Sequence, residues 1–348
     1  MKPKLLECTL RDGSYAVDFQ FTSQFTGVLC RELDNLGFDY IEVGHGIGIG
    51  AEKKYKAAAA TDMEYAIAAE GTSKNSKWGM FAQPHISTLK ELKILRELGM
   101  KFVRIGVDLS ELQIGLDLAQ GASELGLEVF INLMKSYRIS NDEMADACRL
   151  ISEKPWIKGF YLVDSAGGML TSQVDTLSKS IQSNSRQDLE LGFHGHDNLG
   201  MALAHSLLVM QNGFSLIDCT LQGLGRSSGN TSTERLIALL NREGIANKID
   251  PILAMKISDK YIRPIIPRAG HSGLDTMAGY ALFHTAYMDQ LLEIARANRV
   301  DPYALMQEIG MSSPTEVDIQ EIVNKLKNEN SLLEEALPAD RYVGNEQT

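Results

Sequence analysis

Short apolar runs alternate with amphipathic stretches through most of the chain. Eight of these runs are candidate strands, namely 5–10, 40–44, 78–83, 102–107, 128–133, 159–163, 191–194 and 216–221. Each is followed by a segment whose apolar residues recur with the 3.6-residue period of a helix, as in 87–98. Apolar strands separated by amphipathic helices are typical of a parallel sheet covered on both faces. Eight such units in about 240 residues predict a closed (β/α)8 TIM barrel, with a doubly wound open sheet as the alternative.

The pattern changes near Ile249, where the alternation of strands and helices stops. Prolines at 251, 264 and 267 interrupt the chain, and helical stretches are expected at 274–299, 302–309 and 315–328. We therefore predict two domains, a TIM barrel over residues 1–248 and a helical C-terminal domain over residues 249–348.

Composition narrows the class of protein. Apolar residues make up 44% and charged residues 23% of the 348 residues, which is ordinary for a soluble globular protein. A net charge of −11 argues against binding to a nucleic acid backbone. The sequence has no secretory signal and no apolar run near the roughly 18 residues that span a membrane. The four cysteines are scattered, so we expect a reduced, cytoplasmic protein with neither a nucleic acid nor a membrane partner.

Titratable and glycine-rich positions follow the predicted strands. In a barrel, the loops after the strands open on one face, where the active site is built. Convergence of such groups on this face predicts an enzyme. The positions concerned are Asp12, His45, His85, Arg104 within the fourth strand, Lys135, Asp164, His194, His196 and the segment 223–229.

Asp12, His194 and His196 form the candidate metal site. Histidines two residues apart in an extended segment point to the same side. One carboxylate and two imidazoles suit Mn²⁺, Fe²⁺, Co²⁺ or Zn²⁺, whereas Mg²⁺ prefers more oxygen ligands. Asn230 could add an oxygen, or could instead belong to the turn before the next helix. Arg11 would place a fixed positive charge beside the metal, as stabilisation of an enolate requires.

Three segments resemble the barrel metallolyase superfamily, which includes hydroxymethylglutaryl-CoA lyase, isopropylmalate synthase and the 4-hydroxy-2-oxovalerate aldolases. They are Leu-Arg-Asp-Gly at 10–13, His-Gly-His-Asp-Asn at 194–198 and the glycine-rich segment 223–230. The segments 41–48 and 163–168 look most like the HGxG and DSGG segments of the pyruvate-specific aldolases. The acyl-CoA members differ at both places, so the aldolase branch is the better match.

This resemblance implies a class II aldolase, a lyase that cleaves or forms a 4-hydroxy-2-oxo acid through a pyruvate enolate. Asp12, His194 and His196 would bind the divalent metal, for which we expect Mn²⁺, with Mg²⁺, Co²⁺ or Zn²⁺ as alternatives. Arg11 would stabilise the enolate, and Ser165 would contact the carboxylate of the 2-oxo acid.

The general base departs from the family pattern. The aldolases carry a histidine two residues after the motif glycine, where this chain has Tyr15. Their helical tail brings a tyrosine to the site, where this chain has His284 after Gly-Tyr-Ala at 279–281. Our hypothesis is an exchange, with His284 as the base and Tyr15 as an orienting donor; the alternative is that His284 only packs in a helix. His45 is expected to line the site as an acid or as a hydrogen-bond donor.

Other functions stay open at this point. One is an acyl-CoA-dependent carbon–carbon lyase or Claisen-type synthase of the same superfamily. Another is a barrel that has lost catalysis and serves as a binding or partner subunit, as the substitution at Tyr15 suggests. A Schiff-base aldolase using Lys135 is a third. The resemblance also implies an acylating aldehyde dehydrogenase as partner, and we expect a homodimer.

Overall fold

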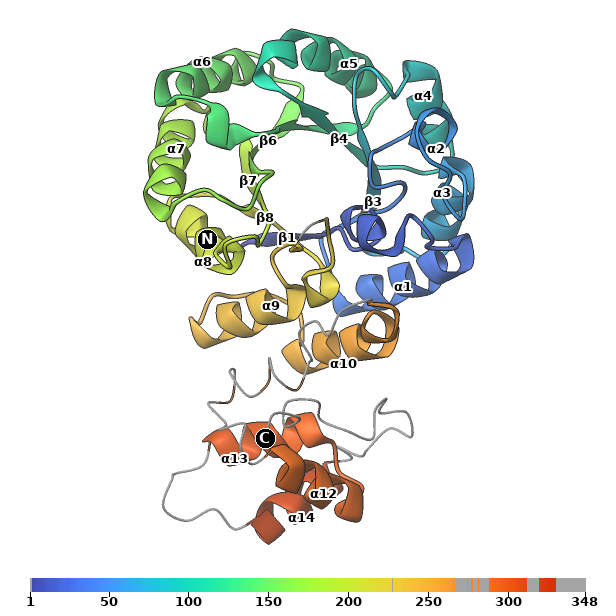
Figure 1. Cartoon of the computed structure of the whole chain (residues 1–348), viewed down its shortest axis with the longest axis vertical. Coiled ribbons are helices and arrows are strands. Elements are labelled where there is room, and N and C mark those ends of the chain that lie inside the picture. Colours follow the sequence, from blue (N-terminus) through green and yellow to red (C-terminus); the bar gives the residue numbers. More distant parts are fainter. Residues whose placement is uncertain are drawn as a thin grey trace.

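The computed structural model describes residues 2–226, 228–266, 274, 277, 281, 288–311 and 319–329. Among these residues, eight parallel strands close into a barrel in sequence order (Figure 1). The predicted TIM barrel is therefore confirmed, and the open sheet is excluded by the pairing of the first strand with the last. The strands are β1 (Lys4–Glu7), β2 (Tyr40–Glu42), β3 (Lys77–Ala82), β4 (Phe102–Val107), β5 (Glu128–Leu133), β6 (Ile157–Asp164), β7 (Glu190–Gly195) and β8 (Leu216–Cys219).

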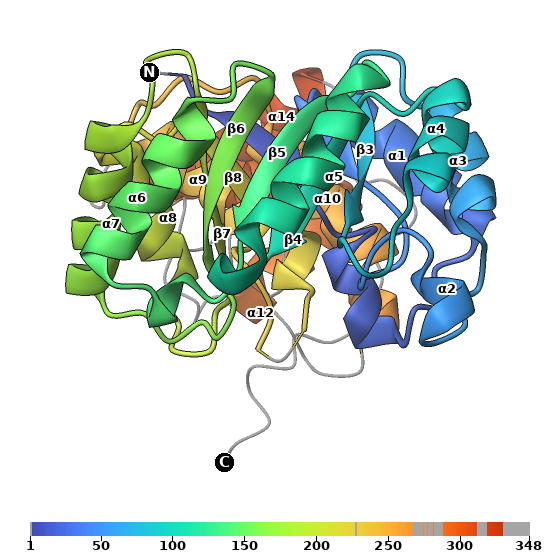
Figure 2. The ribbon, with the colours of Figure 1, turned by 90° about the horizontal axis from the view of Figure 1, so that it is seen from above.

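Helices surround the barrel on its outside (Figures 1 and 2). Strands such as β4 are buried along their whole length because the barrel interior covers one face and the helices cover the other. The helices around the barrel are α1 (Ser23–Leu36), α2 (Ala51–Lys54), α3 (Asp62–Glu70), α4 (Leu89–Glu97), α5 (Leu112–Glu124), α6 (Asn141–Ser152), α7 (Thr171–Asn184), α8 (Ala202–Gln211) and α9 (Thr233–Arg242).

Local sequence signals set where several helices begin and end. Thr61, Thr88 and Ser140 each form a capping box with a glutamate three residues later, and this satisfies free amides of the first turn. Gly37, with φ of 93°, ends α1 in the left-handed conformation that glycine adopts without strain. These signals fix the βα rhythm that brings every strand end to one face.

Aromatic side chains fill the barrel interior at the amino ends of the strands. Tyr40 and Phe102, which begin their strands, pack edge to face at 5.2 Å between ring centroids. Phe130 joins them and also contacts the ring of Tyr161 at 6.2 Å. Because this layer closes the barrel at the amino ends of the strands, polar side chains inside the barrel gather at the carboxyl ends.

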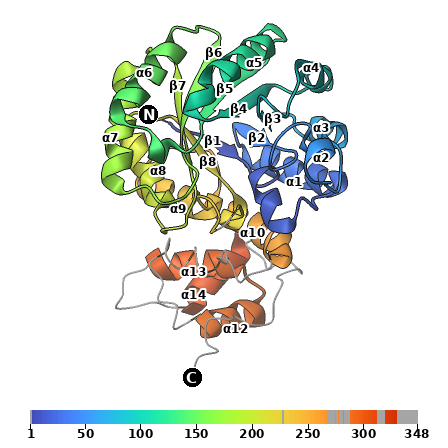
Figure 3. The ribbon, with the colours of Figure 1, turned by 45° about the horizontal axis from the view of Figure 1, so that its top comes forward.

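A second hydrophobic core lies beyond the barrel. It is formed by α10 (Pro251–Tyr261), α12 (Met288–Asn298), α13 (Pro302–Met311) and α14 (Ile319–Asn328), with buried side chains such as Met255 and Tyr303 (Figure 3). A helical region after the barrel is therefore confirmed, although α10 also contacts α1 and α9 of the barrel. Across the part of the chain that is described, no helix is long and apolar enough to cross a membrane.

Glu7 is a fully buried carboxyl group at the end of β1. It accepts hydrogen bonds from the Thr9 amide at 3.0 Å and hydroxyl at 2.6 Å, and from the Leu221 amide at 3.1 Å. Burial raises its pKa from 4.5 to about 7, against the opposing effect of these hydrogen bonds.

The raised pKa of Glu7 predicts a pH-dependent free energy of unfolding. The folded state binds this proton more tightly than the unfolded chain does, so its stabilising effect is complete below pH 4.5 and is lost as pH rises towards 7. We expect Glu7→Gln to remove up to about 3 kcal/mol of this pH dependence in urea titrations. The control is Glu97→Gln on the exposed face of α4, and superimposable slopes for all three proteins would contradict the prediction.

Candidate active site

Asp12, His194 and His196 meet at the carboxyl end of the barrel. Asp12 begins the 3-10 helix η1 (Asp12–Val17) directly after β1, His194 lies in β7, and His196 follows that strand. Asp12 Oδ2 lies 3.3 Å from His194 Nε2 and 3.9 Å from His196 Nε2. All three side chains are buried, and one donor atom from each lies within 4.8 Å of the others. The sequence placed these residues at strand ends, and the structure brings them together.

Each histidine is oriented by a hydrogen bond from the ring nitrogen that faces away from Asp12. His194 Nδ1 donates to Asp218 Oδ2 at 2.7 Å, and His196 Nδ1 donates to the carbonyl of Gly229 at 3.2 Å. A proton on each Nδ1 would leave an Nε2 lone pair directed at Asp12, which is the tautomer a metal ligand needs. Burial lowers the pKa of His194, but its contacts with Asp12 and Asp218 outweigh this and raise the pKa. Burial lowers the pKa of His196 to about 4, so its ring is neutral.

Asn230 lies beside Asp12 in this group. Its amide nitrogen donates to Asp12 Oδ2 at 2.8 Å, while its Oδ1 is buried and has no hydrogen-bond partner among the described residues. An unpartnered buried oxygen beside one carboxylate and two imidazoles fits a divalent cation. Arg11, through its charge, holds the pKa of Asp12 well below its usual range despite burial, so the carboxylate is ionised.

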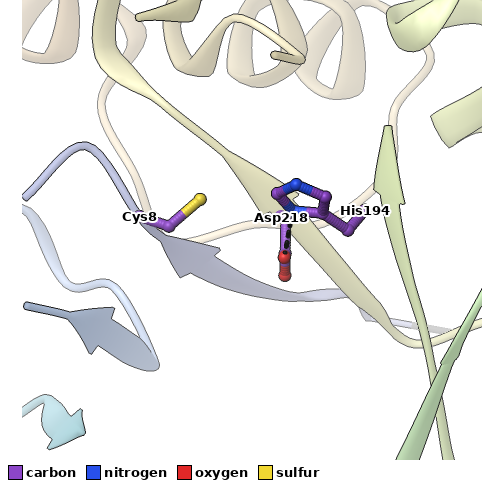
Figure 4. A group of neighbouring side chains, drawn as sticks. All are labelled: Cys8, His194 and Asp218. Carbon is purple, nitrogen blue, oxygen red and sulfur yellow. Dashed lines mark hydrogen bonds and ion pairs between the residues drawn. The ribbon is translucent and has the colours of Figure 1, made fainter. Parts of the chain in front are cut away.

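A second group of possible ligands, Cys8, His194 and Asp218, shares His194 with the first (Figure 4). Cys8 Sγ donates to the carbonyl of Cys219 at 3.4 Å, and burial raises the pKa of the thiol well above its usual range. The thiol is therefore neutral, and Asp218 already binds His194 and Arg104. This group fits a cation less well than Asp12, His194 and His196 do.

Arg11 is buried and held on two sides by carboxylates. Its Nε donates to Glu42 Oε2 at 2.6 Å, and its Nη1 lies 3.2 Å from Asp12 Oδ1. The guanidinium carbon lies 4.7 Å from the centroid of the Phe81 ring, which closes off one face. The result is a rigid positive charge directly beside the candidate metal ligands.

The sequence reasoning missed an ion network under this site. Arg104, fully buried inside the barrel, donates through Nε to Glu42 Oε1 at 2.7 Å and through Nη1 to Asp218. Glu42 also binds Arg11, and Asp218 also binds His194. Arg104 therefore connects the carboxylate that holds Arg11 with the carboxylate that orients His194. The available signal was a charged residue inside each of three otherwise apolar strand segments.

We expect removal of the Asp218 carboxylate to weaken metal binding, because it fixes the orientation and tautomer of His194. Asp218→Ala should weaken Mn²⁺ binding in titration calorimetry by about 10- to 100-fold. Asp218→Asn keeps an oxygen that can accept from His194 Nδ1, so it should lose less. The control is Asp164→Asn, whose carboxylate accepts from the amides of Gly168 and Met169. Wild-type affinity in Asp218→Ala would contradict the role.

Tyr15 and His45 lie on one side of the site and are linked by Phe19. The Tyr15 ring packs against Phe19 at 5.1 Å, and Phe19 stacks on His45 at 4.0 Å. His45 Nδ1 accepts from the Ile47 amide at 3.1 Å, and its Nε2 donates to the carbonyl of Lys56 at 3.0 Å. Both nitrogens of His45 therefore hold its own loop, and its predicted catalytic role stays a prediction.

Ser165 lies in the loop after β6. Its hydroxyl oxygen accepts from the Lys135 amide at 3.0 Å, which leaves the hydroxyl proton available to a ligand. Its carbonyl accepts from Arg226 Nη2 at 3.1 Å. His284, the candidate base, lies outside the described residues, so its position relative to Tyr15 and Ser165 stays a prediction.

This chain is similar to known proteins over most of its length. The HMGL-like family model matches residues 2–260. The 4-hydroxy-2-oxovalerate aldolase of Desulfitobacterium hafniense is 33% identical over 317 residues, which cover 90% of this chain and 94% of that protein. The aldolase of the same name from Geobacillus stearothermophilus is 31% identical over 308 residues, covering 88% and 89%.

Two solved structures share the fold. The N-terminal domain of a putative aldolase from Bacteroides vulgatus has a TM-score of 0.65 and 26% identity, and the match covers 84% of this chain and 99% of that chain. The HMG-CoA lyase of Bacillus subtilis has a TM-score of 0.68 and 19% identity, covering 80% and 98%. The family match and the identities of 31% and 33% to the two aldolases confirm the superfamily resemblance inferred from the sequence.

Proposed function

Because this chain belongs to the HMGL-like family, we propose that it is a divalent-metal-dependent aldolase that cleaves or forms a 4-hydroxy-2-oxo acid through a pyruvate enolate. The observation that carries the proposal is the position of Arg11 and Asp12 beside His194 and His196 at the carboxyl end of the barrel. The relatives named as 4-hydroxy-2-oxovalerate aldolases match nearly the whole chain and support it.

In this reaction the C3–C4 bond of the 4-hydroxy-2-oxo acid breaks. The C4 hydroxyl loses its proton and becomes the aldehyde carbonyl, while the bonding electron pair moves into the C2–C3 enolate. Protonation at C3 then gives pyruvate, so the atoms balance without an oxidant or a reductant. A divalent cation held by Asp12, His194, His196 and Asn230 would supply Lewis-acid stabilisation of the charge at the C2 oxygen.

Arg11 would place N–H groups at the same oxygen. Its charge is fixed in place by Glu42 and Asp12, so no reorganisation is required when negative charge develops. The site is buried, and electrostatic interactions there are stronger than in water. Ser165, whose hydroxyl proton is available, would donate to the substrate carboxylate.

The proton of the C4 hydroxyl needs a base and an orienting donor. We assign these roles to His284 and Tyr15, because the two residue types are exchanged relative to the pattern of the related aldolases. Burial raises the pKa of Tyr15 above 10.0, so its hydroxyl is protonated and can act as a donor. His45 would line the same side of the site through its contact with Phe19.

The finer assignments extend this proposal. The two nitrogen ligands and one carboxylate favour Mn²⁺ as the metal, with Co²⁺, Zn²⁺ and Mg²⁺ as alternatives. The helices after the barrel would form a separate domain from residue 249, through which the protein homodimerises in the cytoplasm. An acylating aldehyde dehydrogenase that consumes the aldehyde would be its partner.

Pyruvate release from a panel of 4-hydroxy-2-oxo acids tests the function. We expect release with Mn²⁺, loss of release with EDTA, and recovery when Mn²⁺ is restored, because the cation offsets the charge at the C2 oxygen. A strict need for coenzyme A would favour an acyl-CoA lyase or synthase instead. Absence of metal-dependent pyruvate from every member of the panel would overturn the aldolase proposal.

A further inference from the structure

Arg226 reaches across the mouth of the site from the loop that follows β8. Its Nη2 donates to the carbonyl of Ser165 at 3.1 Å, and its guanidinium carbon lies 5.9 Å from the centroid of the Tyr15 ring. Its side chain is exposed to solvent. Arg226 therefore lies between Tyr15, in the loop after β1, and Ser165, in the loop after β6.

No carboxylate pairs with this guanidinium within the described ranges of the chain. Two other cations at the same rim are matched, since Lys135 Nζ lies 2.5 Å from Asp108 and Lys56 Nζ binds Asp18. A guanidinium offers five N–H donors, and the contact with Ser165 uses one of them. Arg226 thus presents a positive charge and several hydrogen-bond donors to any ligand that enters the active site.

A divalent cation and one substrate carboxylate would balance the charges deeper in the site without Arg226. Three buried carboxylates face two buried guanidiniums, which leaves one negative charge in excess. A divalent cation would turn this into one positive charge, and the single carboxylate of a 2-oxo acid would neutralise it. The residues in this count are Asp12, Glu42, Asp218, Arg11 and Arg104. The charge of Arg226 is therefore available to a second anionic group on the ligand.

We propose that Arg226 binds a carboxylate on the aldehyde fragment, so that the preferred substrates are 4-hydroxy-2-oxo dicarboxylic acids. This inference rests on the aldolase function proposed above. Arg226 lies between Ser165, assigned to the C1 carboxylate, and Tyr15, assigned to the C4 hydroxyl. Because Ser165 would already donate to the C1 carboxylate, we assign the remaining donors of Arg226 to the C4 side of the substrate. One planar guanidinium matches the single charge and the two oxygens of a carboxylate, whereas a phosphate dianion would require further donors.

Binding of matched ligands tests the proposal without turnover. The ligands 2-oxopentanedioate and 2-oxopentanoate have equal chain length and differ only in a terminal carboxylate, and neither has the C4 hydroxyl needed for cleavage. The pair 2-oxohexanedioate and 2-oxohexanoate extends the reach by one carbon. In titration calorimetry with Mn²⁺, we expect the dicarboxylate of at least one pair to bind about tenfold more tightly to the wild type.

Variants of Arg226 decide which carboxylate it holds. Arg226→Gln should abolish the preference for the dicarboxylate, and Arg226→Lys should keep part of it. The matched control is Lys135→Gln, which removes a cation already paired with Asp108 and should leave the preference unchanged. Equal weakening of both ligands by Arg226→Gln would place Arg226 on the shared C1 carboxylate and overturn the proposal, as would a wild type that shows no preference.

Turnover separates this inference from the aldolase function itself. The ratio of kcat/KM between 4-hydroxy-2-oxohexanedioate and 4-hydroxy-2-oxohexanoate should exceed about tenfold in the wild type and approach unity in Arg226→Gln. Cleavage of both substrates with equal efficiency would overturn the role of Arg226 while the aldolase function stands. Absence of pyruvate from either substrate and from the wider panel would overturn the aldolase function, and calorimetry would still decide the role of Arg226.

Discussion

Asp12→Asn is expected to abolish metal-dependent pyruvate release. Asp12 is the one carboxylate of the group formed with His194 and His196, and its Oδ2 faces both Nε2 atoms. Asparagine removes the charge, and either orientation of its amide gives a weaker ligand than a carboxylate. We expect Mn²⁺ affinity to fall by more than about 100-fold in titration calorimetry, since loss of a ligand exceeds the loss of a supporting contact. The rate of pyruvate release should fall by at least about 1000-fold.

The matched control for this variant is Asp197→Asn. Asp197 follows His196 in the sequence, and its carboxylate accepts from the amide of Ala202 at 3.0 Å. A thermal melt provides a second measurement, because Mn²⁺ should raise the Tm of the wild type and of Asp197→Asn and leave that of Asp12→Asn unchanged. An Asp12→Asn protein with Mn²⁺ affinity within about threefold of wild type would refute the assignment.

The barrel could be predicted because its signal is repeated eight times. Each predicted strand overlaps an observed one, as in 159–163 against β6 (Ile157–Asp164). The predicted strand ends were less accurate next to the candidate active site. Residues 5–10 were predicted as a strand, but β1 ends at Glu7, because the amides of Arg11 and Asp12 turn back to the carbonyl of Cys8. A turn of this kind depends on backbone hydrogen bonds that periodicity does not describe.

The candidate metal ligands could be found because residue type and spacing point to metal binding. The ion network beneath them could not. Arg104 is 62 positions from Glu42 and 114 positions from Asp218, and their pairing exists only after the barrel closes. In the sequence each is a lone charge within an apolar run. The partner of such a charge can be predicted only once it is known which strands place side chains in the same layer of the barrel interior.

Arg226 illustrates a different limit. The sequence showed it only as part of a glycine-rich segment after the last strand. Its position over the site depends on left-handed backbone at Gln222 and Gly223, with φ of 59° and 63°. It also depends on a hydrogen bond from the backbone amide of Asn230 to the carbonyl of Gly223. The loop thereby turns across the site and places the guanidinium near Tyr15. A loop path of this kind cannot be predicted from composition.

Arg11→Lys should separate enolate stabilisation from metal binding. Lysine keeps the positive charge but cannot bind Glu42, Asp12 and a substrate oxygen at once, as the forked guanidinium can. We expect kcat for pyruvate release to fall by about 100- to 1000-fold, because the lost N–H groups act on charge that develops at the C2 oxygen. Mn²⁺ affinity in calorimetry should change far less than in Asp12→Asn, since Asp12, His194 and His196 remain. A kcat within about threefold of wild type would show that Arg11 serves only to hold Asp12. A loss of Mn²⁺ affinity as large as that of Asp12→Asn would lead to the same conclusion.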